Sequence, residues 1–313
     1  MTGSSTFSQG SPGRLNWLGK ALLERTSRAE QSHPPIGEFV MVDGKRVHFS
    51  RQGSGPALIL IHGAGGNLRD FTFQLADKLA RHNTVIAFDR PGHGYTDAIH
   101  ARGETPAEQA ELLDQASRAI GLKRAAILGY SLGGAVALAW ALARPEFVKS
   151  LLLVSAVTHP WPGGVGLLYG SAANPLTSGL VVPAISALAR QSLVETTLYS
   201  VFHPNLPPEG YLDYIGAGLS LRPHSLRANA RQVGRLKYHM SLMAPKYPTL
   251  NLPIEILHGS EDRTVYASIH AVQLQRDAPN AHYTPLPGIG HAPHHHSHLE
   301  IIDAVHRLNT LRN

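Results

Sequence analysis

Residues 127–134 read ILGYSLGG, an apolar run that ends at a serine with glycines on both sides. Gly129, Ser131 and Gly133 form the pattern G-x-S-x-G at the point where a predicted strand passes into a predicted helix. A turn this tight leaves no room for side chains two residues before and after the serine, which explains the glycines. With Tyr130 before it, the Ser131 hydroxyl would project from the carboxyl edge of a sheet toward a helix N-terminus. We therefore predict that Ser131 is a nucleophile.

Apolar runs alternate with helical patterns on both sides of this stretch. Such runs, bounded by Gly, Pro and Asn, are typical of parallel strands covered by helices on both faces. Asp43-Gly44 predicts a two-residue hairpin, and Thr105 with Glu108 predicts a capped helix start. The predicted strands are 38–42, 45–51, 57–61, 84–88, 125–129, 148–154, 253–259 and 281–286, and the predicted helices include 68–81, 132–145, 265–276 and one from about 299.

The alternation stops between residues 158 and 245, where a Pro/Gly-rich entry is followed by short helical patterns and no strand-like run. Interruption of an otherwise regular pattern is typical of an insertion. We predict an α/β fold: a mostly parallel central sheet flanked by helices, with a helical cap inserted between the two halves of the sheet. The expected division is a leader with a helix at 1–35, a core at 36–157 and 246–313, and the cap at 158–245.

The composition limits the chemistry. The chain has 313 residues and no cysteine, so thiolate metal sites and cysteine nucleophiles are excluded. Its net charge is +6, but no run of Lys and Arg exceeds two residues, so we expect no nucleic-acid binding. No stretch approaches the roughly 20 apolar residues of a membrane span, and the N-terminus lacks a signal peptide's apolar segment. We therefore expect a cytoplasmic protein. The oligomeric state is not predicted.

The N-terminal segment 14–28 has an amphipathic pattern. Leu15, Trp17, Leu18 and Leu22 form an apolar stripe, with basic residues around it. The two interpretations are a loosely packed leader helix and a weak peripheral contact with a membrane surface.

A serine nucleophile needs a base, and the base needs a group that orients it. His291 follows the last predicted strand in the sequence Gly-Ile-Gly-His, and Asp262 follows the strand that ends at residue 259. Both therefore lie at the carboxyl edge of the predicted sheet, together with Ser131. The order Ser131, Asp262, His291 is that of a serine-aspartate-histidine triad in this type of fold. Glu261 is the alternative for the acid.

A glycine-rich loop follows an early strand and completes the predicted site. It begins with His62 and Gly63 and continues through Ala64. The backbone N–H groups of Ala64 and Leu132 are the expected donors to a developing oxyanion. A phosphate-binding loop is the rival interpretation, but the sequence has neither G-x-x-x-x-G-K-[ST] nor a G-x-G-x-x-G that opens the helix.

Taken with these motifs, the sequence resembles the α/β-hydrolase superfamily over residues 36–311. The likeness includes His62-Gly63 and the loop DRPGHG at residues 89–94, which is structural in that family, so Asp89 has no expected catalytic role. The resemblance implies the capped branch of esterases, epoxide hydrolases, haloalkane dehalogenases and cofactor-free haloperoxidases. Because epoxide hydrolases and dehalogenases carry aspartate at the position of Ser131, the resemblance argues against those two activities.

Five histidines crowd into residues 291–298. His294 and His298 would share one face of a helix, but no carboxylate has the usual spacing for a metal site. We expect a solvated helix start, with no metal and no cofactor, and adventitious zinc binding is the alternative.

The expected function is hydrolysis of an ester with a small or medium hydrophobic acyl group. The alternatives are a cofactor-free perhydrolase or haloperoxidase and a carbon-carbon bond hydrolase with the same triad, or, in another class, a ligand receptor without turnover. The apolar and aromatic residues of the predicted cap would roof a mostly apolar pocket, although much of this set must form the cap's own core: Trp161, Leu167, Leu168, Tyr169, Val181, Val182, Leu188, Tyr199 and Phe202.

Overall fold

The strands of the computed structural model form one sheet within the described residues, which are 13–164, 167–174, 177–189 and 191–310. The side chains of residues 13–18, 167–169 and 191 lie outside the description. The sheet order is β1-β2-β4-β3-β5-β6-β7-β8, with β2 antiparallel to both neighbours and the other pairs parallel. The strands are β1 (Glu38–Val42), β2 (Lys45–Gln52), β3 (Ala57–Ile61), β4 (Thr84–Phe88), β5 (Ala125–Tyr130), β6 (Val148–Val154), β7 (Ile254–Gly259) and β8 (Ala281–Leu286).

Both faces of the central strands β3 to β7 are buried, as continuous apolar runs predict. Successive residues of β3 alternate between two hydrophobic cores: Ile59 packs in one and Leu60 in the other. The first core is covered by α4 (Pro106–Ala119), α5 (Leu132–Ala143) and α12 (Ala271–Asp277), and the second by α3 (Leu75–Leu79) and α14 (His298–Thr310). The predicted sheet with helices on both faces is therefore confirmed.

Local signals placed several element ends correctly. The hairpin turn at Asp43 and Gly44 has positive φ at both residues, as a tight two-residue connection requires. Thr105 and Glu108 form a reciprocal capping box at the start of α4.

Two predicted helices differ from the structure. The segment 68–81 divides into α2 (Arg69–Thr72) and α3, since the backbone of Gln74 leaves the helical region at φ −150°. The segment 265–276 becomes α-helical only from Ala271. Val265 makes other contacts with its backbone: its amide donates to the Asp262 side chain, and its carbonyl accepts from the His258 side chain.

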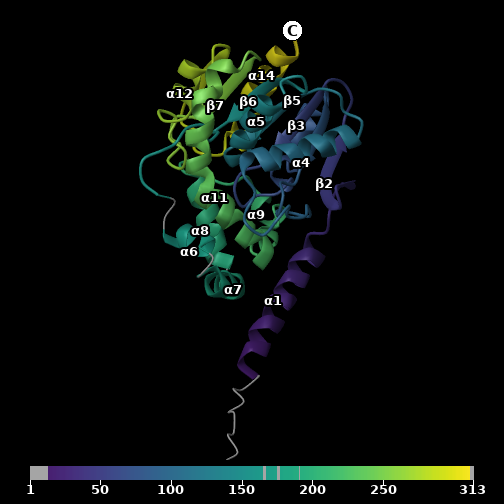
Figure 1. Cartoon of the computed structure of the whole chain (residues 1–313), viewed down its shortest axis with the longest axis vertical. Helices are drawn as coiled ribbons and strands as arrows, with labels where there is room; N and C mark the ends of the chain where they lie inside the picture. The colour runs from purple at the N-terminus through teal and green to yellow at the C-terminus, as the bar shows by residue number, and fades with distance from the viewer. Residues whose placement is uncertain (1–12, 165–166, 175–176, 190, 311–313) are drawn as a thin grey trace, which may run out of the picture.

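A helical insertion separates β6 from β7. It comprises α6 (Leu167–Ala173), α7 (Ser178–Leu188), α8 (Gln191–Phe202), α9 (Tyr211–Tyr214), α10 (Ala217–Ser220) and α11 (Pro223–Met243), followed by the 3-10 helix η1 (Ala244–Thr249). These helices gather at one end of the sheet, with α11 running back toward the core (Figure 1). The insertion reaches the loop after β3, where Asn229 accepts a hydrogen bond from the Gly65 amide at 2.8 Å.

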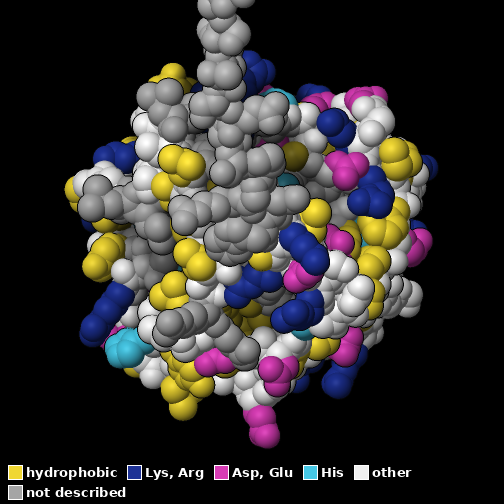
Figure 2. Space-filling view, turned by 90° about the horizontal axis from the view of Figure 1, so that it is seen from below, with side chains coloured by type: hydrophobic (Ala, Val, Ile, Leu, Met, Phe, Trp, Pro, Cys, Tyr) yellow, Lys and Arg dark blue, Asp and Glu magenta, His cyan; other side chains and the backbone are white. Residues whose placement is uncertain are grey.

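The N-terminal helix α1 (Gly13–Ser32) projects from the end of the molecule that carries the insertion (Figure 1). Arg25 donates to the carbonyls of Ser186 and Ala189, which fastens α1 to the insertion. Figure 2 shows this end face-on, with hydrophobic side chains interspersed among Lys and Arg. Within the described part of the chain, no helix has the length and apolar character needed to cross a membrane.

Candidate active site

Ser131 stands at the sharp turn between β5 and α5. Its φ of 52° and ψ of −118° lie outside the ordinary regions for a residue with a side chain. The flanking glycines are required by backbone contacts. A Cβ at Gly129 would lie 2.6 Å from the Gly133 carbonyl oxygen, and a Cβ at Gly133 would overlap the Ile61 carbonyl. The crowding predicted around the serine is therefore present, but it comes from neighbouring backbone and not from the serine itself.

The structure brings Ser131, His291 and Asp262 together from three loops at the carboxyl edge of the sheet. The Ser131 hydroxyl Oγ lies 3.1 Å from His291 Nε2, in position to donate to it. His291 Nδ1 lies 2.7 Å from Asp262 Oδ2, to which its N–H donates. All three residues are buried. The arrangement can pass a proton from the hydroxyl to an imidazole whose tautomer is set by the carboxylate.

Asp262 is held more firmly than the sequence indicates. Its Oδ1 accepts from the amides of Thr264 and Val265 at 2.8 and 2.9 Å, while His258 Nε2 lies 3.1 Å from Oδ2. Burial alone would raise the pKa of Asp262, but hydrogen bonds from His258 and His291 outweigh it and hold that pKa below its usual range.

Glu261, the alternative acid, is exposed, and no hydrogen bond or ion pair joins it to His291 among the described residues. His258 lies within the predicted strand 253–259 and was not predicted as a site residue. Its one sequence signal is a polar residue near the end of the otherwise apolar strand β7.

The loop after β3 approaches the serine. A Cβ at Gly63 would lie 3.1 Å from the Ser131 Cβ, so glycine is needed for this close approach. The Gly65 amide is taken up by Asn229, whereas the amides of Ala64 and Leu132 donate no hydrogen bond to any described residue. Those two N–H groups are therefore free to receive an oxyanion.

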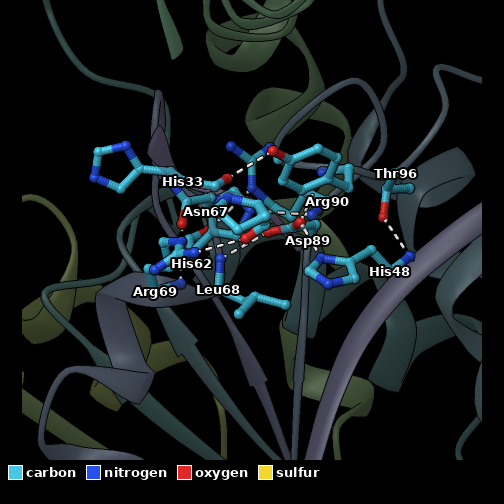
Figure 3. Close-up of polar contacts among 12 residues, drawn as sticks. His33, His48, His62, Asn67, Leu68, Arg69, Asp89, Arg90 and Thr96 are labelled. Carbon is cyan, nitrogen blue, oxygen red and sulfur yellow. Dashed lines mark hydrogen bonds and ion pairs between the residues drawn. The ribbon is translucent and has the colours of Figure 1, made fainter. Parts of the chain in front are cut away.

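Hydrogen bonds of Arg90 and His62 hold the loop after β3 in place. Arg90 Nε and Nη2 donate to the carbonyls of His62 and Gly63 at 2.9 and 2.8 Å, and the Arg90 amide donates to His62 Nε2 at 3.0 Å. Burial lowers the pKa of Arg90 to about 9, which still leaves it charged at neutral pH. Burial also lowers the pKa of His62, which keeps that ring neutral. Figure 3 shows His62 and Arg90 within one group of polar contacts.

Asp89 makes only structural contacts among the described residues, in agreement with its expected lack of a catalytic role. Its carboxylate accepts from His48 Nδ1 at 2.6 Å and from the amides of Leu68 and Tyr95 at 2.7 and 2.8 Å (Figure 3). The carboxylate also occupies the space that a side chain at Gly94 would need.

A cavity of about 370 Å³ lies between the glycine-rich loop after β3 and the helical insertion. Tyr130 and Ala292, the sequence neighbours of Ser131 and His291, line it, together with Gly63 and Ala64, whereas Ser131 and His291 are not lining residues. Most of its apolar lining comes from the insertion: Ala172, Ile185, Ala189, Leu193, Val194, Leu198, Val201, Phe202, Ile215, Leu221 and Leu226.

The apolar residues predicted for the insertion divide between the cavity wall, the insertion's own core and the surface. Of those with described side chains, Phe202 alone lines the cavity. Leu188 and Tyr199 face outward, with 69% and 46% exposed, and Val182 packs inside the insertion's own core. Residues 167–169 lie outside the described side chains.

The histidine-rich run also differs from its prediction. His294 and His295 are buried in the cavity wall instead of solvated, and each donates from Nε2 to Asp70 Oδ1, at 3.1 and 3.0 Å. His298 shares no helix with His294, since α13 (Pro293–His296) ends before Ser297. The sequence around the histidine run has no carboxylate at the spacing of a metal site, but the fold places the carboxylate of Asp70 beside His294 and His295.

Comparisons with known proteins agree with this geometry. The family described as the alpha/beta hydrolase fold matches residues 56–296. A Mycobacterium tuberculosis protein named as uncharacterized is 32% identical over 295 residues, covering 88% of this chain and 81% of its own. The 2-hydroxy-6-oxo-6-phenylhexa-2,4-dienoate hydrolase of Burkholderia cepacia is 24% identical over 290 residues, covering 89% and 96%.

Solved structures extend the likeness. The esterase RhEst1 of a Rhodococcus species has a TM-score of 0.69 at 26% identity, covering 89% of this chain and 100% of its own. A serine hydrolase of carbazole degradation, CarC, has a TM-score of 0.70 at 19% identity, covering 88% and 99%, and so shares the fold.

A sharp turn from a parallel strand into a helix at Ser131, in a sheet of this strand order, is typical of the alpha/beta hydrolase fold. The chain belongs to the alpha/beta hydrolase fold family, and it is a hydrolytic enzyme.

Proposed function

We propose that the protein is a serine hydrolase that cleaves esters of a small or medium hydrophobic acid through an acyl-enzyme on Ser131. The observation that carries this proposal is the unbroken hydrogen-bond chain from Ser131 through His291 to Asp262, beside a mostly apolar cavity. A serine hydroxyl is a weak nucleophile at neutral pH, and an oriented base activates it.

In the proposed reaction His291 Nε2 accepts the Ser131 proton while the serine oxygen attacks the ester carbonyl carbon. The N–H groups of Ala64 and Leu132 donate to the carbonyl oxygen as it gains negative charge. Asp262 keeps the proton on His291 Nδ1 and stabilises the imidazolium that forms. His291 then protonates the leaving alcohol, and water repeats both steps on the acyl-enzyme to release the acid.

The cavity lining favours a neutral acyl group over an anionic one. No Lys or Arg belongs to the described lining, and its carboxylate is Asp70. A dienoate, the substrate type in the name of the Burkholderia relative, carries a negative charge that this wall would not neutralise. We therefore place the carbon-carbon hydrolase second. A perhydrolase would use the same residues with peroxide as acyl acceptor, and a receptor would bind without turnover.

We also propose that residues 158–245 are a cap on the core formed by 36–157 and 246–313. Support comes from the cavity, whose apolar side chains belong mainly to α7, α8 and α11 and the segments between them. The cap would then set the acyl length that fits.

The test is turnover of p-nitrophenyl acetate, butyrate and octanoate with fluorophosphonate labelling, for the wild type, Ser131→Ala and Ser155→Ala. Ser155 is a matched control, because it is buried at the end of the adjacent strand and also has positive φ. Turnover and labelling should vanish in Ser131→Ala and persist in Ser155→Ala. A wild type that labels with fluorophosphonate but hydrolyses only a dienoate would favour the carbon-carbon hydrolase, and one that does neither would favour the receptor.

Acyl-length preference tests the cap. Val201→Trp should shorten the cavity and reduce octanoate turnover relative to acetate by about tenfold. Tyr199→Trp on the same helix is the control, because Tyr199 faces outward. An unchanged ratio in Val201→Trp would contradict the cap's role.

We further propose a weak peripheral membrane contact through residues 14–28. Leu23 of α1 is 73% exposed, and Leu180, Leu188 and Leu193 of the neighbouring insertion are exposed as well. Leu23→Glu should reduce co-sedimentation with anionic phosphatidylglycerol vesicles, whereas equal sedimentation would remove this proposal. The expected cytoplasmic location stays a prediction.

A further inference from the structure

A second histidine-carboxylate cluster lies in the cavity wall. Asp70 comes from α2, and His294 and His295 come from α13, and the three residues meet in the wall of the cavity. The single oxygen Asp70 Oδ1 lies 3.1 Å from His294 Nε2 and 3.0 Å from His295 Nε2. All three are at least nine-tenths buried, and one ligand atom from each lies within 4.8 Å of the other two.

These separations suit a metal ion. Zn²⁺ binds imidazole nitrogen and carboxylate oxygen at about 2.0–2.2 Å, so neighbouring ligand atoms around it lie about 3.0–3.5 Å apart. One carboxylate oxygen and two imidazole nitrogens are donors that Zn²⁺, Co²⁺ and Ni²⁺ accept, and that hard cations such as Ca²⁺ do not favour. Three protein ligands facing a cavity also leave a position open for a further ligand.

Surrounding residues hold the three ligands in place. The Tyr211 hydroxyl donates to Asp70 Oδ1 at 2.7 Å, which is the kind of outer contact that orients a metal-binding carboxylate. The Tyr130 ring packs on His294, with ring centroids 4.1 Å apart. Within the described chain His294 Nδ1 is buried without a partner, so Nε2 carries the polar contacts of this ring.

We propose that Asp70, His294 and His295 form a binding site for a divalent transition metal ion of the Zn²⁺ class. Each imidazole would carry its remaining proton on Nδ1 and bind through Nε2. The ion would give the cavity wall a positive charge that its described lining lacks, and its open position would accept a carboxylate or hydroxyl group of a small ligand. The site does not depend on the proposed ester hydrolysis.

The experiment uses the full chain without an affinity tag, freed of metal by chelator. Co²⁺ binding is followed by visible absorption, and Zn²⁺ binding by calorimetry. We expect one Co²⁺ per chain with ligand-field bands, and affinity at least about 100-fold weaker in Asp70→Asn, His294→Gln and His295→Gln. Tyr211→Phe should weaken binding about tenfold, because it removes only an outer contact.

His296→Gln and His298→Gln are the matched controls, since both histidines belong to the same run but lie outside the cluster. They should bind as the wild type does. Loss of binding in these controls alone would mean adventitious binding to the histidine run, and a wild type without binding would mean a hydrogen-bonded cluster only. Either result overturns the proposal.

Circular dichroism and fluorophosphonate labelling of the same samples show whether each variant is folded. Since metal binding is measured without turnover, its failure and the failure of the proposed hydrolysis are distinguishable.

Discussion

Asp262 and Asp70 are two buried carboxylates that each contact a pair of histidines. The two pairs differ in the groups that the histidines contact next. Asp262 Oδ2 contacts His258 and His291, and His291 continues to the Ser131 hydroxyl. Asp70 Oδ1 contacts His294 and His295, which end at the cavity wall. The Asp262 carboxylate is therefore connected through His291 to the proposed nucleophile Ser131, whereas the Asp70 carboxylate and its histidines face the cavity, where we propose that an ion binds.

The anchoring of the two carboxylates differs as well. Backbone amides of the neighbouring loop hold Asp262 Oδ1, so this carboxylate depends only on the core. Asp70 depends on the insertion, because Tyr211 donates to it. Burial alone would raise both pKa values, yet the neighbouring histidines hold both below the usual range for aspartate. Ionisation is thus common to the two clusters, and position decides their roles.

The largest expected difference is in catalysis. Asp262→Asn should lower kcat for p-nitrophenyl acetate by about 10⁴-fold, because asparagine stabilises the wrong imidazole tautomer. Asp70→Asn in metal-free enzyme should change kcat by less than about tenfold, since no hydrogen bond links Asp70 to Ser131 or His291 among the described residues. Steady-state kinetics of the two variants checks this, and equal losses would contradict the separation of roles.

A smaller effect is expected at the second histidine of the Asp262 pair. His258 does not touch Ser131, and it positions Asp262, so His258→Gln should lower kcat about tenfold and leave KM unchanged. His282→Gln is the control, because His282 is an exposed histidine paired with a carboxylate outside the site. A KM effect without a kcat effect would argue against positioning.

Buried histidines without a carboxylate partner should lower the free energy of unfolding as the pH falls. Burial lowers the pKa of His93 and of His270 to about 3, and His270 Nδ1 accepts from the amides of Thr158 and His159. The ordinary value is about 6.5, so the unfolded state binds more protons between pH 6.5 and 3. The stabilising contribution is complete above pH 6.5 and is lost as the pH falls toward 3.

His270→Gln should therefore flatten the pH dependence of the unfolding free energy by up to about 1.4 kcal/mol per pH unit in this window. Urea unfolding at pH 7, 6, 5 and 4 measures the slope. If the slope matches that of the wild type, His270 is not held neutral by the fold.

Local pattern was sufficient for the strands and for the principal site residues. Apolar runs predicted the central strands β3 to β7, because a strand buried on both faces carries its signal in five or six adjacent residues. The hairpin signal at Asp43 and Gly44 predicted β1 and β2. Ser131, Asp262 and His291 each follow a strand that ends at the same edge, so knowing the strand order along the chain was enough to bring them together.

The pocket wall and the Asp70 cluster depended on the folded chain. Asp70 and His294 are separated by 224 positions, and no periodicity links the short helix α2 after β3 to the short helix α13 after β8. The insertion's inward side could not be read from composition, since a helix that packs on other helices and a helix that lines a cavity have the same apolar pattern. Only the docking of the insertion onto the sheet decided that Val201 faces the cavity and Tyr199 faces solvent.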